Sequence, residues 1–227
     1  MTHSRSLGLI FAFVVFFSVV PASLLNAGAD FEHLYQKATD APREWEQFAS
    51  VPVFRWEQPV LEISFHVSGP APAEMLKSMN DEFDADANFL AEKAKKTLNL
   101  SLWSKGDQEP EIVVFIGTRK SLWNLVGYVD ETLETEFAKD LVGIRERGES
   151  FCSSSLQKTS SGTIKRAVIL VDRDERPNYC LRRNLILSFG LVGSLDNGKA
   201  SILALDQMEE FYTPLDGLLL ERLYATD

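Results

Sequence analysis

Two cysteines are the residues of this chain best suited to covalent chemistry. Cys152 and Cys180 are the only cysteines in the sequence. An even number of cysteines in an exported chain predicts one disulfide, which would stabilise the fold by roughly 3–4 kcal/mol. The alternatives are two free thiols or a thiol nucleophile, which needs a histidine as its base, and only His33 and His66 follow the N-terminal segment. We therefore expect a structural disulfide between Cys152 and Cys180.

The first 29 residues have the pattern of a secretory signal peptide. Arg5 precedes Leu7–Val20, an uncharged run of 14 residues, and residues 27–29 place small side chains at the −3 and −1 positions of a cleavage site. A membrane-spanning helix needs about 20 residues, so the alternative of an uncleaved anchor would have to extend across Pro21. We expect an exported protein, periplasmic or extracellular, with no stable membrane anchor after cleavage.

The charge and the motifs exclude several classes of function. The chain carries 33 acidic and 23 basic residues, a formal charge of −10. Nucleic acids and anionic lipids bind basic surfaces, so we expect neither as a partner. The sequence has no glycine-rich phosphate loop, no G-x-S-x-G and no C-x-x-C motif. The charge run Asp172–Arg176 lacks the spaced ligands and turn glycine of a calcium loop, so we expect a solvated loop there.

Periodicity in the first half of the chain predicts a strand followed by a long helix. Apolar and polar residues alternate over 61–68, which predicts a half-buried strand with His66 on its polar, surface-facing side. Apolar residues then recur every three or four positions from Leu76 to Ala94. This spacing predicts a helix of about 25 residues, and we expect the acidic residues of its other face, from Asp81 to Asp86, to be solvated.

The second half of the chain predicts two buried strands and two helices. Apolar runs at 111–117 and 164–172 are typical of buried strands, and the serine-rich segment 151–162 is typical of a loop or an edge strand. Residues 178–191 predict a helix that Gly190 ends. Thr213, Pro214 and Asp216 predict the capped start of a last helix, whose expected buried face is Leu215, Leu218, Leu219 and Leu223. Together these elements indicate a single α/β (α+β) domain around a mixed sheet, over residues 51–227, after an N-terminal arm at 30–50.

Two segments of the chain resemble parts of zincin metalloproteases. Residues 183–191, RNLILSFGL, resemble the zincin active-site helix H-E-L-x-H-x-L-G-L, and residues 201–225 resemble the Met-turn and final helix of matrixin-type proteases. The chain is more closely similar to the exported bacterial proteins grouped as domain of unknown function 2927. The motifs that carry this similarity are Arg55-Trp56, Cys152, Cys180, Phe189-Gly190-Leu191, Ser201-Ile202, and a closing segment with Asp216, Leu220, Leu223 and Tyr224. The resemblance implies a zincin-like domain with a twisted mixed sheet, a long N-terminal helix, an active-site-like helix and a C-terminal helix.

The metal chemistry of zincins does not carry over to this chain. A zincin helix holds zinc with two histidines one turn apart and places a glutamate between them as the base. Those three positions hold Arg183, Asn184 and Leu187, and Gly193 stands at the third ligand position of the longer motif. The resemblance therefore implies a degenerate helix that binds no metal, and we expect no cofactor.

Arg183 has two interpretations. It is either a surface arginine paired with one of the many acids, or its guanidinium occupies the vacated metal position and pairs with a carboxylate such as Glu149 or Asp196.

The function that these observations favour is non-catalytic. We expect a module on a pseudo-metalloprotease fold that binds a peptide or protein in the cleft beside the edge of the sheet. The alternative is a peptidase-like hydrolase that uses an unrecognised carboxylate or calcium site.

Overall fold

The computed structural model describes residues 22–40, 51, 53–69, 73–102, 110–133, 135, 137, 151–206 and 209–225. The chain divides into two compact units, residues 1–33 and 34–227. Within the described segments, no helix is long and apolar enough to cross a membrane. The predicted signal run Leu7–Val20 and Glu149 lie outside these segments.

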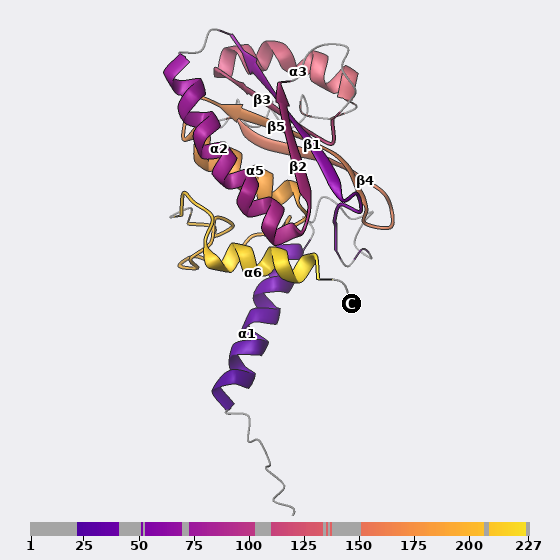
Figure 1. Ribbon diagram of the computed structural model, residues 1–227, viewed down its shortest axis with the longest axis vertical. Helices are drawn as coiled ribbons and strands as arrows, with labels where there is room; N and C mark the ends of the chain where they lie inside the picture. Colours follow the sequence, from indigo (N-terminus) through magenta and orange to yellow (C-terminus); the bar gives the residue numbers. More distant parts are fainter. Residues whose placement is uncertain are drawn as a thin grey trace, which may run out of the picture. The chain divides into compact units, whose positions relative to one another are not determined.

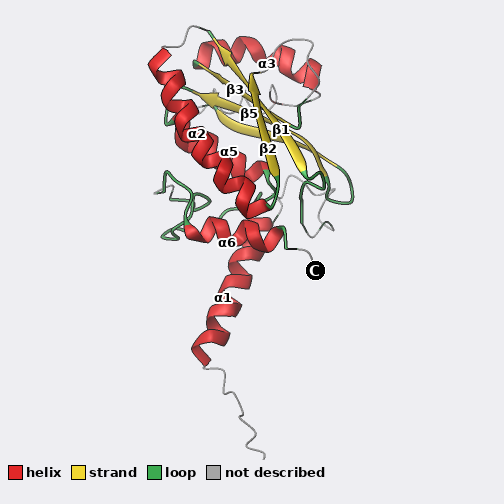
Figure 2. Cartoon of the chain, viewed as in Figure 1, coloured by secondary structure: helices red, strands yellow, loops and turns green. Residues whose placement is uncertain are grey.

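The second unit contains a five-stranded mixed sheet and its helices (Figure 2). The strands are β1 (Val60–Ser68), β2 (Thr97–Leu102), β3 (Ile112–Gly117), β4 (Cys152–Lys158) and β5 (Ile164–Asp172). Their order across the sheet is β2-β1-β3-β5-β4, in which β4 is antiparallel to β5 and the other neighbours are parallel. The helices of the second unit are α2 (Ala73–Ala94), α3 (Arg119–Leu133), α5 (Pro177–Ser188) and α6 (Pro214–Leu223), together with the end of α1 (Ala22–Thr39), which begins in the first unit. This architecture confirms the α+β domain that the periodicities predicted.

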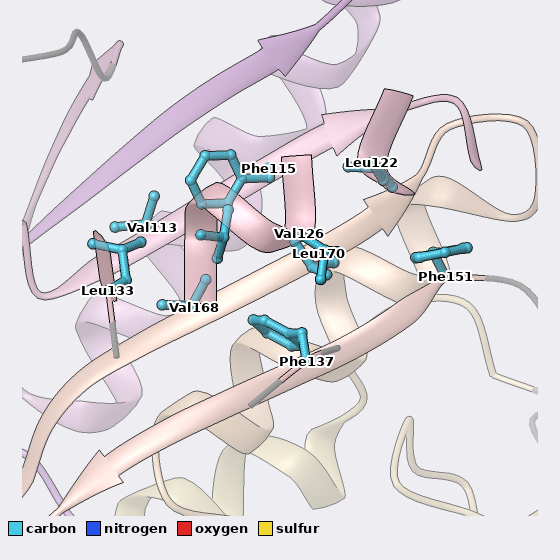
Figure 3. Packing of buried hydrophobic residues seen from close by; sticks show 10 residues of the cluster. Val113, Phe115, Leu122, Val126, Leu133, Phe137, Phe151, Val168 and Leu170 are labelled. Carbon is cyan, nitrogen blue, oxygen red and sulfur yellow. The ribbon is translucent and has the colours of Figure 1, made fainter. Parts of the chain in front are cut away.

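One face of the sheet is covered by α3 and the other by α2 and α5 (Figure 1). Residues of β3 and β5 that point to the first face pack with the apolar side of α3 (Figure 3). The cluster consists of Val113, Phe115, Leu122, Val126, Val129, Leu133, Phe137, Phe151, Val168 and Leu170. On the second face, Phe65 of β1 makes an edge-on contact with Phe83 of α2 at 4.4 Å between ring centroids. Because β3 is covered on both faces, all of its residues are buried, as its unbroken apolar run predicted.

The first unit and the start of the second share helix α1. Ala22–His33 are the described residues of the first unit, and Leu34–Thr39 belong to the second. In the second unit, the carbonyl of Ala38 accepts a hydrogen bond from the Gly193 N–H at 2.9 Å. Residues 34–39 of the expected N-terminal arm are therefore part of the folded domain. Cleavage of a signal peptide after Ala29 stays a prediction.

The capped starts and ends of the last helices agree with the sequence. Thr213 and Asp216 form a capping box at the start of α6, and Gly190, just after α5, has a φ of 106°. The expected buried face of α6 was wrong at one residue. Leu218 was expected to be buried but is 52% exposed, whereas Leu220 is fully buried. The six-residue strand β2 was not predicted, although its leucines alternate with polar residues.

Two expectations about polar residues were wrong. His66 lies on the polar side of β1 but is half-buried, because its ring packs edge-on against Phe115 at 5.5 Å, and burial lowers its pKa. Asp86 was expected on the solvated face of α2 but is only 9% exposed, since it faces α5. The run Asp172–Arg176 is largely exposed as expected, except that Asp172 is buried at the end of β5.

Candidate functional site around helix α5

Helix α5 packs against β4, β5 and α2. The backbone before β1 lies close to the residues at the C-terminal end of α5. Pro177 occupies the first turn, where its missing N–H costs nothing. A Cβ atom at Gly190 would lie 1.9 Å from the carbonyl oxygen of Phe54. Glycine is therefore required at position 190 both for its φ and for its contact with the chain before β1.

The two cysteines form a disulfide that joins the edge strand to this helix. Cys152 is the first residue of β4 and Cys180 lies in the first turn of α5, with their Cα atoms 5.4 Å apart. The predicted disulfide is thus confirmed. Asn184, at the position of the zincin glutamate, is buried, and its side-chain amide donates to the Cys180 carbonyl at 2.9 Å and to the Cys152 sulfur at 3.2 Å. Asn184 therefore holds the disulfide to the first turn of α5.

Arg183 binds neutral groups. Its guanidinium donates to the carbonyl of Ile202 at 2.8 Å and to the hydroxyl of Ser194 at 3.3 Å. Asp196, one of the two carboxylates named in the second interpretation of Arg183, accepts from the ammonium of Lys37 at 2.6 Å. Arg183 therefore fastens α5 to the loop that follows it, and the structure does not pair it with Asp196.

The other two positions of the degenerate motif have no chemistry of their own. Leu187 is a half-buried apolar residue of α5. A Cβ atom at Gly193 would lie 1.9 Å from the carbonyl oxygen of Lys37. Gly193 thus permits a close backbone contact with the end of α1.

The strongest electrostatic feature of α5 is Arg182, which the sequence analysis did not single out. Its side chain is 4% exposed and forms ion pairs with Asp86 at 2.7 Å and with Glu82 at 3.0 Å, both on α2. Burial raises the pKa of Asp86, and the neighbouring guanidinium opposes that rise. Glu82 and Asp86 are one helical turn apart, and this spacing could have indicated a shared partner. The guanidinium neutralises both carboxylates, so the network joins α2 to α5.

Trp56 and Tyr224 connect the chain before β1 to the ends of α5 and α6. The indole N–H of Trp56 donates to the Ser188 carbonyl at 2.8 Å. The Tyr224 hydroxyl accepts from the Trp56 backbone N–H at 3.2 Å and donates to the Phe189 carbonyl at 2.9 Å. Both aromatic side chains are buried, so these bonds satisfy groups that water cannot reach.

Asp216 organises the loop between α5 and α6. Its carboxylate is fully buried and accepts from the Ser201 hydroxyl at 2.5 Å, the Ile202 N–H at 3.2 Å and the Thr213 N–H at 2.8 Å. Burial raises its pKa against the effect of these hydrogen bonds. The Ser-Ile pair and the closing aspartate thus meet in one network, although the sequence separates them by more than ten residues.

The chain belongs to the family described as protein of unknown function DUF2927, whose model matches residues 32–227. No curated protein matches its sequence. In this DUF2927 protein, the motif residues Trp56, Asp216 and Tyr224 have internal hydrogen-bond partners, as described above. Within the described residues, no group of three or more His, Cys, Asp and Glu side chains is placed to hold a metal ion.

Proposed function

We propose that this DUF2927 protein is an exported, non-catalytic module with a zincin-like fold, which binds an extended peptide segment of a partner protein along strand β4. The observation that carries the proposal is the position of β4. It is the antiparallel edge of the sheet, and within the described residues it pairs with a strand on one side only. An exposed strand edge is a template for the backbone of an added strand.

The hydrogen bonds between β4 and β5 indicate which backbone N–H and C=O groups of β4 remain free to pair with an added strand. The Asp172 N–H donates to the Phe151 carbonyl at 2.8 Å, and successive residues of an antiparallel strand alternate between facing the partner and facing away. Ser153 and Ser155 then face β5, whereas Ser154 and Leu156 direct their N–H and C=O groups outward. From Cys152 to Gln157 the strand carries no charge, so its edge has none of the lysine or acid side chains that commonly block strand pairing.

Two further features support a binding role. The disulfide and the amide of Asn184 fix the start of β4 to α5, so the edge is held rigid before a peptide arrives. The residues at the zincin ligand positions make contacts within the protein, which is what we expect of a pseudo-protease. The disulfide is also compatible with export, since such bonds persist in oxidising compartments.

The test is selection of a peptide from a library of extended segments, followed by amide hydrogen exchange of the protein with and without it. We expect the peptide to protect the amides of Ser154 and Leu156, while those of Ser153 and Ser155 are already protected by β5. Protection confined to another element, or failure to select any peptide, would contradict the proposal.

Two variants sharpen this test. Ser154→Pro removes an outward N–H and should abolish binding, because proline cannot donate to an added strand. Ser154→Ala keeps the N–H and should bind as the wild type does. Mass spectrometry of the peptide after incubation separates the hydrolase alternative, since a hydrolase would cleave what it binds.

A further inference from the structure

Strand β2 is the second edge of the sheet, opposite β4. Within the described residues it pairs with β1 only, and the two strands are parallel. The Thr97 N–H donates to the carbonyl of Pro59, the residue before β1, at 2.8 Å. Because successive residues of a strand bond to opposite sides, every second residue from Thr97 bonds to β1. The backbone N–H and C=O groups of Leu98, Leu100 and Leu102 therefore point outward, away from the sheet.

The side chains of the same three leucines form an apolar row along this edge. In the register with β1, Leu102 lies beside Phe65, whose ring contacts Phe83 of α2. The row is thus on the face of the sheet that α2 covers, but it is open toward the edge, since Leu100 is 40% exposed and Leu102 is 80% exposed. The strand TLNLSL also carries no charge, in a chain with 33 acidic and 23 basic residues. An uncharged edge with exposed leucines favours pairing with another strand.

The sequence of β2 indicates which strand would pair with it. Residues 98–102 read LNLSL, so apolar and polar residues alternate in the same order in both directions from Leu100. A two-fold axis through the edge at Leu100 would place β2 antiparallel to β2 of a second copy. Leu100 would then oppose Leu100, and Leu98 would oppose Leu102. These are the residues whose backbone groups point outward, and hydrogen-bonded antiparallel pairs require such groups on both strands. A second copy therefore satisfies the backbone and matches each leucine with a leucine.

The polar residues of β2 lie on the other face of the sheet and hold the strand in place. The hydroxyl oxygens of Ser101 and Ser64 are 2.6 Å apart, and the Asn99 amide donates to the Glu62 carboxylate at 2.6 Å. In the same two-fold arrangement Asn99 opposes Ser101 of the second copy, so a polar pair meets a polar pair. Both faces of the strand are thus complementary to themselves.

We propose that β2 is a homodimer interface, in which two copies of this chain join by antiparallel pairing of their β2 strands about Leu100. The dimer continues the sheet across the two-fold axis and covers the exposed leucines of both copies. Since β4 is the opposite edge of the sheet, the dimer leaves the proposed peptide site open and does not depend on it.

The experiment is sedimentation equilibrium of the purified protein over a series of concentrations, with residue-resolved amide hydrogen exchange of the same samples. We expect a monomer–dimer equilibrium, with slower exchange of the Leu98, Leu100 and Leu102 amides as the concentration rises. The amides of Asn99 and Ser101 already bond to β1 and should not change. A monomer throughout the series, or a dimer without protection of the three leucine amides, would overturn the proposal.

A charged variant tests the contact at the axis. Leu100→Lys places two ammonium groups opposite each other and removes two leucines from each dimer, so dimerisation should weaken on the order of a hundredfold. The fold should tolerate the change, because the side chain is 40% exposed on an edge strand. Leu218→Lys, the same substitution at an exposed leucine of α6, is the matched control and should dimerise as the wild type does. Unaltered dimerisation of Leu100→Lys, or an equal loss in Leu218→Lys, would refute the interface.

Cysteine variants test the register. Residue 100 faces its own copy with Cα atoms about 5.5 Å apart, a separation that a disulfide spans. Leu100→Cys should therefore form a covalent dimer on mild oxidation, whereas Leu98→Cys alone should not, since it opposes Leu102. Covalent dimers of Leu98→Cys, with none of Leu100→Cys, would overturn the pairing about Leu100.

Discussion

Substitution of Tyr224 by phenylalanine isolates the polar contacts that connect the two ends of the domain. The change removes one oxygen atom and keeps the ring, which packs edge-on against Phe189 at 6.4 Å. Without the hydroxyl, the N–H of Trp56 and the carbonyl of Phe189 lose their partner inside a buried region. Each unsatisfied buried group costs about 1–3 kcal/mol, so with two such groups we expect Tyr224→Phe to lower the free energy of unfolding by about 2–6 kcal/mol.

The assay is urea denaturation followed by circular dichroism, with a thermal melt alongside. For a domain of this size, 1 kcal/mol corresponds to roughly 2–4 °C, so the melting temperature should fall by roughly 4–24 °C. Tyr212→Phe is the matched control. The Tyr212 hydroxyl donates to a single acceptor, the carbonyl of Arg182 at 3.0 Å, so about half the loss is expected. A Tyr224→Phe protein as stable as the wild type, or more stable than Tyr212→Phe, would refute this account of the contact.

Three further predictions concern the disulfide, the buried ion pairs and a lysine. Replacing both Cys152 and Cys180 by serine should lower the free energy of unfolding by about 3–4 kcal/mol, from the loop of 28 residues that the bond closes, measured by urea denaturation. Arg182→Met should cost about 3–5 kcal/mol at pH 7, because it leaves the buried carboxylate of Asp86, together with the partly exposed carboxylate of Glu82, without their cation. Arg183→Met should cost less than about 1.5 kcal/mol in the same assay, since its partners are neutral. Equal losses of stability in Arg182→Met and Arg183→Met would contradict the view that Arg182 is the arginine that neutralises buried charge. Burial lowers the pKa of Lys158 to about 8, so a ¹³C NMR titration of its Cε should have a midpoint there. Since the unfolded chain holds that proton to a higher pH, the free energy of unfolding should rise as the pH increases above about 8, and Lys158→Met should remove this rise.

Local patterns carried most of the information about the fold. The alternation over 61–68, the long apolar stripe ending at Ala94 and the capping residues Thr213 and Asp216 depend on neighbours in sequence, and each corresponds to an observed element. The disulfide was also predictable, because two cysteines allow only one pairing.

Contacts between distant segments could not be read in this way. Asp86 has the surroundings of a solvated helix residue in the sequence, and only the packing of α2 on α5 brings it to Arg182. The same limit applies to Arg183, whose carbonyl partner at Ile202 depends on the course of a loop. The contact of Asn184 with the disulfide likewise required the geometry, because Asn184 and Cys152 are far apart in the sequence.

The central proposal is that α5 has a structural role: it holds the edge strand β4 through the disulfide and binds no metal ion. The most direct test is elemental analysis of the purified protein before and after treatment with a chelator, with a melting curve of each sample. We predict no stoichiometric metal and no change in the melting temperature. One zinc or calcium ion per chain, with a melting temperature that falls on chelation, would contradict the claim and favour the hydrolase alternative.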